Sequence, residues 1–297
     1  MSTGRSKDAL TSIASWFFPT MPRGRVATMR TIIYAFVFID VLLTTAWVAR
    51  HAHLPGPLYD PLFIGRILPL PVPTFAVVRG VEIALLVCAA VALTGRFVRA
   101  AGAAVFFLYF EWMVIAFSYG KVDHDRFAFL VALAVLPTVG TARWGDRSPD
   151  QAAGWAIRCI QIGVVATYFL AAFAKLRFGG IEWVNGATLM RAVIRRGTFL
   201  GDPLEDLPWV LVAAQYWIMI FELASPLLFI SGRVGHAWWW ISVIFHVVTF
   251  ATIGIIFLPH LVCLLSFRRL ERFDPQALFD RLHARARAPT PITGRNA

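Results

Sequence analysis

Long apolar blocks alternate with short polar segments along almost the whole chain. The blocks predict eight helical spans, at residues 27–49, 74–93, 100–118, 127–140, 155–175, 209–230, 236–253 and 254–267. Most of these spans approach the roughly 20 residues that a helix needs to cross the hydrocarbon core of a bilayer. The eighth is shorter and contains Pro259, so it either tilts with its neighbour or is re-entrant. The pattern predicts an all-α, polytopic membrane bundle of about eight helices.

Arginine predicts the orientation of this bundle. It is concentrated before the first span, after the last, and in every second segment between spans, whereas the other segments also carry acidic residues. Because basic residues mark cytoplasmic loops, both termini are predicted to be cytoplasmic. The predicted organisation is a cytoplasmic or interfacial segment at 1–26, a transmembrane domain at 27–267, and a basic, partly disordered cytoplasmic tail at 268–297.

The composition favours a membrane protein over a nucleic-acid-binding one. Hydrophobic residues make up 58% of the chain and charged residues only 15%, against about 25% charged residues in a soluble domain. The net charge of +11 comes from arginines in the polar segments, and no nucleic-acid-binding motif accompanies it. The three cysteines lie inside apolar blocks without a CxxC pair, which predicts buried, unpaired thiols.

Lys175 stands where a lysine is costly, at the end of an apolar block. It is one of three lysines in a chain whose other 25 basic residues are arginines. Arginine keeps its proton in proteins, whereas a desolvated lysine can lose it, so Lys175 is a candidate for proton chemistry. The alternative is that its amine extends to the membrane interface without a catalytic role. Lys175 and His124 are both predicted at the extracytoplasmic ends of their spans.

Other ionisable residues inside the spans predict a polar cavity, since such groups face the interior of a membrane bundle. They are Asp40, Arg79, Glu82, Glu111, Arg158, Glu222 and His246. Three alternatives stay open: Arg79 and Glu82 form an ion pair on one helix face, the remaining charges pair with one another, and His246 is a buried core histidine. No metal site is predicted, because no HxxxH or HxxE pattern lies on one helix.

Several motifs, taken in order, resemble one family. They are MRTIIYAFVFIDVLL, SYGKVDHDRFAFLVAL, YFLAAFAKL followed by FGGIEWVNGATL, FELASPLLFISGRVGHAW, and FHVVTFATIGIIF. Together they resemble the membrane domain of vitamin K-dependent gamma-glutamyl carboxylases, which belongs to the HTTM (horizontally transferred transmembrane) grouping. The resemblance covers residues 27–267. It implies an integral enzyme of the lyase or ligase type in a bacterial cytoplasmic membrane, with its active side extracytoplasmic.

The resemblance also implies chemistry and site residues. Lys175 would be the base that deprotonates a reduced naphthoquinone, either menaquinol or a vitamin K hydroquinone-like lipid, and His124 would assist at the anion. The anion would react with O₂ to give a strong base, with CO₂ as a possible further reactant and no metal. His246, Asp40, Tyr168 and Trp183 would line or shape the quinone cavity. The implied partners are membrane lipid and the lipid quinone.

The sequence departs from the family in ways that leave the substrate open. The carboxylases continue into a large extra-membrane domain, whereas this sequence ends at residue 297. FAKL replaces two adjacent lysines, and VDH replaces a pattern with two asparagines. The substrate could therefore be an extracytoplasmic protein or peptide, or a small molecule. Two alternatives remain: a non-enzymatic transporter or toxin-maturation or immunity factor, and a DoxX-like subunit of a quinone-linked oxidoreductase.

Overall fold

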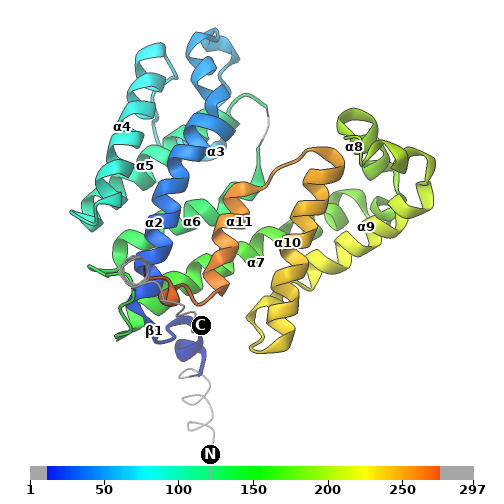
Figure 1. Cartoon of the computed structure of the whole chain (residues 1–297). Helices are drawn as coiled ribbons and strands as arrows, with labels where there is room; N and C mark the ends of the chain where they lie inside the picture. The colour runs from blue at the N-terminus through cyan, green and yellow to red at the C-terminus, as the bar shows by residue number, and fades with distance from the viewer. Residues whose placement is uncertain (1–11, 121, 275–297) are drawn as a thin grey trace, which may run out of the picture.

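The protein is an all-α bundle (Figure 1). A computed structural model describes residues 12–120 and 122–274, and 77% of these described residues are helical. The principal helices are α2 (Arg23–Ile39), α3 (Phe63–Ile67), α4 (Phe75–Leu93), α5 (Val98–Phe117), α6 (Phe127–Val135), α7 (Gln151–Gly179), α8 (Ala187–Arg196), α9 (Pro208–Leu223), α10 (Arg233–Ile253) and α11 (Leu258–Leu264). The predicted segments before residue 12 and after residue 274 lie outside the described residues.

Among the described residues, five helices are long and apolar enough to cross a membrane: α2 with its extension to Thr44, α4, α5, α7 and α10. They coincide with five of the eight predicted spans. The other three predicted spans are shorter than expected. The helix α6 has nine residues, or about 14 Å, which is roughly half of a bilayer core. The helices α9 and α11 are also short, and each is continued by a 3₁₀ turn.

The short helix α6 lies inside the bundle. Five of its nine residues are buried, and it packs against α5, α7 and α11. Arg30 of α2 fixes the segment that follows: its guanidinium donates to the carbonyl oxygens of Leu136 and Gly140, at 2.7 and 2.9 Å, and also to that of Val139. A buried arginine thus satisfies carbonyl groups that the end of a helix leaves without partners.

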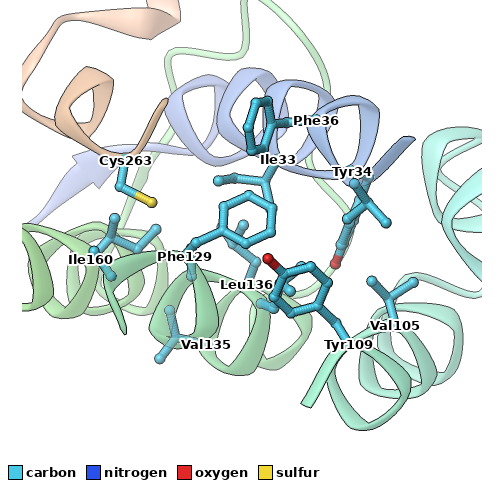
Figure 2. Packing of buried hydrophobic residues seen from close by; sticks show 14 of the residues in the cluster. Ile33, Tyr34, Phe36, Val105, Tyr109, Phe129, Val135, Leu136, Ile160 and Cys263 are labelled. Carbon is cyan, nitrogen blue, oxygen red and sulfur yellow. The ribbon is translucent and has the colours of Figure 1, made fainter. Parts of the chain in front are cut away.

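The main core lies where α2, α5, α6 and α7 meet (Figure 2). Aromatic rings pack edge-on there: Phe129 makes edge contacts with Phe36 and Tyr109, at ring-centroid distances of 5.3 and 5.1 Å. Cys263 of α11 points into the same core, and all three cysteines are free, which confirms the prediction of unpaired thiols.

The outward faces of α4 and α10 are apolar. In α10, Ile244, Val247 and Phe250 are 50–57% exposed, and α4 exposes Ile83 and Val87 in the same way. Such contiguous apolar surfaces are unusual on soluble monomers and are typical of helices in contact with lipid. On α4, Arg79 and Glu82 form the predicted ion pair, at 2.6 Å.

The longest helix, α7, is fixed at its start. Asp150 caps it by accepting a hydrogen bond from the Ala153 amide at 3.1 Å, and the same carboxylate binds Arg23 at 2.6 Å. A two-residue antiparallel ladder between β1 (Met21–Pro22) and β2 (Pro149–Asp150) joins this point to the start of α2. With 29 residues, α7 is about 43 Å long and can carry functional side chains along most of the bundle.

An ion pair joins the start of α2 to the segment after α11. Arg25 binds both carboxylate oxygens of Glu271, at 2.9 and 3.0 Å. Burial by itself raises the pKa of Glu271. The hydrogen bond and the charge of Arg25 lower that pKa by more than burial raises it, so the net shift is downward. The two ends of the described chain are therefore held at the same end of the bundle.

We expect Glu271→Gln to lower the stability at neutral pH by about 1 kcal/mol or less, since the pair is partly screened by solvent. A carboxyl group with a lowered folded pKa contributes stability above its unfolded pKa and loses that contribution as pH falls. The difference between variant and wild type should therefore shrink below about pH 4. Thermal unfolding in detergent across pH 3–8 checks this, with the exposed Glu205→Gln as control. A difference that persists at pH 3 would contradict the linkage.

Candidate functional site

A cavity of about 690 Å³ lies among α7, α8, α9, α10 and α11. Its wall is largely apolar, and its lining includes Leu189, Val193, Leu211, Ile218, Ile241, Phe245, Ile253 and Phe257. The acidic and basic side chains in this lining are those of His124, Asp125, Lys175, Glu222, His246 and His260. An apolar cavity of this size with a few convergent polar groups is typical of a site for a small organic molecule.

One face of α7 forms a wall of the cavity. Tyr168, Ala171 and Lys175 all line it, at spacings of three and four residues, which places them on the same side of a helix. Tyr168 and Lys175 are two turns apart, or about 10 Å along the axis.

Lys175 is held by a carboxylate and an aromatic ring. Its Nζ atom binds both oxygens of Glu222 on α9, with 2.5 Å to Oε2, and lies 4.9 Å from the centre of the Trp183 ring. The Lys175 side chain is 22% exposed and that of Glu222 only 7%. The sequence predicted a desolvated lysine that can lose its proton, without a partner for its amine. The structure adds a buried carboxylate that can exchange a proton with it.

A second polar cluster faces the cavity from α10 and α11. The hydroxyl of Tyr168 and the Nε2 atom of His246 share a hydrogen bond of 2.7 Å. The ring of His260 packs edge-on against Tyr168 at 4.5 Å and lies 5.4 Å from the ring of His246. Gly254, with a φ of +64°, ends α10 and lets the chain turn back, so that α11 brings His260 beside His246.

His124 reaches the cavity from the turn before α6. Its ring lies 6.4 Å from that of Phe257, which in turn lies 5.3 Å from His246. His124 and Lys175 also line a neighbouring cavity of about 520 Å³, so both side chains contribute to two cavities. The structure thus brings the predicted base and the predicted helper to one site, although 50 residues separate them in the chain.

Asp125, next to His124, also lines the larger cavity. It is 5% exposed and accepts a hydrogen bond from Arg126 at 3.1 Å. Burial raises the pKa of Asp125 to about 6, although the charge of Arg126 opposes that shift. Asp125 is absent from the site residues predicted from the sequence, because one aspartate among loop residues gives no signal of its burial.

Asp40 was predicted to line or shape the cavity. In the part of the chain that the structure describes, it does not line the cavity. Its carboxylate, which is fully buried, accepts hydrogen bonds from Tyr109 at 2.7 Å and from Thr44, and pairs with Arg126 at 3.3 Å. Asp40 begins a π-helical turn, Asp40–Thr44, that continues α2. Arg126, which contacts both Asp40 and Asp125, connects it to the site.

Apart from Arg79 and Glu82, the charged residues predicted inside the spans do not pair with one another within the described residues as one alternative proposed. Asp40 pairs with Arg126 and Glu222 with Lys175, while Arg158 packs over the ring of Trp16 at 4.6 Å. Glu111 is buried and has no hydrogen-bond partner among residues 12–120 and 122–274. The first two partners are basic residues at the ends of helices, which a search of the apolar blocks alone could not connect.

Three further findings bear on the identity of the site. Within the described ranges, no group of three histidine, cysteine or carboxylate side chains is arranged to hold a metal ion.

Trp217, Ile244 and Val248 line the cavity and yet remain about half exposed, at 49–56%, so the cavity adjoins the outer surface between α9 and α10. Comparisons with protein-family models, with curated proteins and with solved structures find no match for this chain.

Proposed function

We propose that this protein is an integral membrane enzyme that binds a reduced naphthoquinone in the cavity between α7 and α10 and deprotonates it with Lys175. The enzyme class is that of the vitamin K-dependent carboxylase-like proteins. One observation carries the proposal: Lys175, His124, His246, Tyr168 and Trp183, all selected from the sequence, line a single apolar cavity. A two-ring lipid fits the apolar wall, and its ring hydroxyls require the few polar groups.

The Lys175–Glu222 pair supplies a route for the proton. The lysine gives its own proton to the adjacent carboxylate, and its neutral amine then takes the proton of the ring hydroxyl. The O–H bond of the ligand breaks, an N–H bond forms, and the proton that leaves Lys175 rests on Glu222. The apolar wall excludes water, which strengthens the electrostatic interactions within the pair. His124, which lines the same cavity, would donate a hydrogen bond to the ring oxygen as it becomes anionic.

Reaction with O₂ completes the proposed chemistry. One reduced naphthoquinone and one O₂ yield one 2,3-epoxide and one water, so that the ring is oxidised and O₂ is reduced. When bound, the reduced naphthoquinone would supply, together with O₂, the base that removes a proton from a carbon acid, and CO₂ could then add to that carbon. The extracytoplasmic position predicted for Lys175 and His124 would present this step to a protein, peptide or small molecule on that side.

The test uses the full chain in lipid nanodiscs with a reduced short-chain menaquinone and dissolved O₂. We expect the epoxide, detected by mass spectrometry, to form in proportion to the amount of protein. Replacing the reduced ligand by its oxidised quinone, or removing O₂, should abolish the product. If only the quinone accumulates, at the rate of the nanodisc blank, the proposed function is wrong.

A further inference from the structure

The cavity has two polar ends, and only one of them belongs to the proposed proton transfer. The Lys175–Glu222 pair forms the first end. The second is formed by His246 and His260, about two helical turns away along α7. These imidazoles come from two different helices and converge beside Tyr168, the residue that begins the shared face of α7.

The second end carries hydrogen-bonding capacity that the described chain does not use. Both ring nitrogens of His260 and the Nδ1 atom of His246 have no hydrogen-bond partner among the described residues. His260 is 1% exposed and His246 is 5% exposed, and both line the cavity. Buried polar groups without partners are costly, so native proteins rarely keep them without a use for them.

The imidazole pair can offer both a donor and an acceptor. When the hydroxyl of Tyr168 donates to Nε2 of His246, Nδ1 of that ring carries a proton and can donate. The neutral ring of His260 has one N–H group and one bare nitrogen. A ligand hydroxyl, which donates one hydrogen bond and accepts others, matches this set better than a carbonyl, which only accepts.

We propose that His260, together with His246, binds the second hydroxyl of a two-ring diol whose first hydroxyl lies at Lys175. This inference rests on the proposed function and adds to it the orientation of the ligand and a preference for its reduced form. The hydroxyl can accept a hydrogen bond from Nδ1 of His246 and donate one to the bare nitrogen of His260 that faces it, and a quinone carbonyl, which has no proton, cannot make the second of these bonds.

The test compares two ligands of the same carbon skeleton, under anaerobic conditions. One is the reduced naphthoquinone with two ring hydroxyls, and the other is the 1-naphthol analogue with one. Binding is read from the fluorescence of tryptophan, since Trp183 and Trp217 line the cavity. A buried hydrogen bond is worth roughly a factor of 10 in affinity, so the wild type should bind the diol about 10-fold more tightly than the naphthol.

His260→Phe should remove this 10-fold preference and leave the affinity for the naphthol within about a factor of two, because the single hydroxyl still lies at Lys175. His260→Gln, which keeps a donor and an acceptor, should retain part of the preference. His236→Phe is the matched control: His236 lies outside the cavity lining, hydrogen-bonded to Trp240 and Arg268. Retained binding of the naphthol shows that each variant is folded.

The outcomes separate the two proposals. If both ligands bind the wild type and His260→Phe keeps the full preference for the diol, the second end is not a hydroxyl site, while the proposed function stands. If the wild type binds neither ligand, both proposals are overturned. Loss of the preference in His260→Phe, but not in His236→Phe, supports the inference.

Discussion

Replacing Lys175 by arginine is expected to abolish epoxide formation while leaving the fold and the ligand site in place. Arginine preserves the positive charge, so it can keep the ion pair with Glu222 and the contact with Trp183. It cannot give up its proton within a protein, and so it cannot accept one from the ligand. Loss of a general base typically costs 10²- to 10⁴-fold in rate, and we expect turnover to fall by about that range.

The measurement compares epoxide formation and ligand affinity for the same preparation. Arg177→Lys is the matched control, because Arg177 is close in sequence but lines neither of the two cavities. Lys175→Met combined with Glu222→Gln gives a second inactive variant in which no buried carboxylate is left without a partner. Turnover near that of the wild type in Lys175→Arg would show that the amine does not carry the proton.

Replacing Arg126 by methionine is expected to cause the largest loss of stability. Arg126 is 7% exposed and is the shared counter-charge of Asp40, Asp123 and Asp125. Its removal leaves the fully buried carboxylate of Asp40 without a cation, and breaking a buried ion pair in this way costs about 3–5 kcal/mol. We expect a lower unfolding temperature and a poor yield of monodisperse protein.

The control for Arg126 is Arg66→Met, which breaks an ion pair with Asp60 whose side chains are 60% and 81% exposed. An exposed pair contributes less than about 1 kcal/mol, so this variant should unfold close to the wild type. Adding Asp40→Asn to Arg126→Met should restore part of the lost stability, because it removes the unpaired charge. Equal unfolding temperatures for the two single variants would contradict the proposed role of Arg126.

The sequence predicted the class of fold and much of the candidate site, but not the connections between helices. Block length and hydropathy identify α4, α5, α7 and α10 because a helix that crosses a bilayer must satisfy its backbone internally and expose apolar side chains. The same criteria overestimate the length of α6, because a helix buried within protein is as apolar as one in lipid. Length, not composition, distinguishes the two cases.

The same limit applies to the site residues. Lys175 was identifiable because it is a rare residue in an apolar block. The family resemblance identified His124, and it identified His246 in addition to its position as an ionisable residue inside a span. Glu222 was seen as a charge in a span but not as the partner of Lys175, since contacts between α7 and α9 leave no periodic signal in either helix. His260 follows Pro259 in a short helix. It reaches the cavity because the chain turns back at Gly254, and the sequence pattern did not predict that turn.

The half-exposed wall between α9 and α10 has a consequence for how a ligand would arrive. A molecule dissolved among the acyl chains could pass Trp217 and Val248 without ever crossing into water. Its supply would then depend on its mole fraction in the bilayer and on two-dimensional diffusion, and an isoprenoid tail could stay outside among the lipids. Lengthening that tail should therefore change the concentration needed in bulk solution far more than the occupancy at a fixed membrane content.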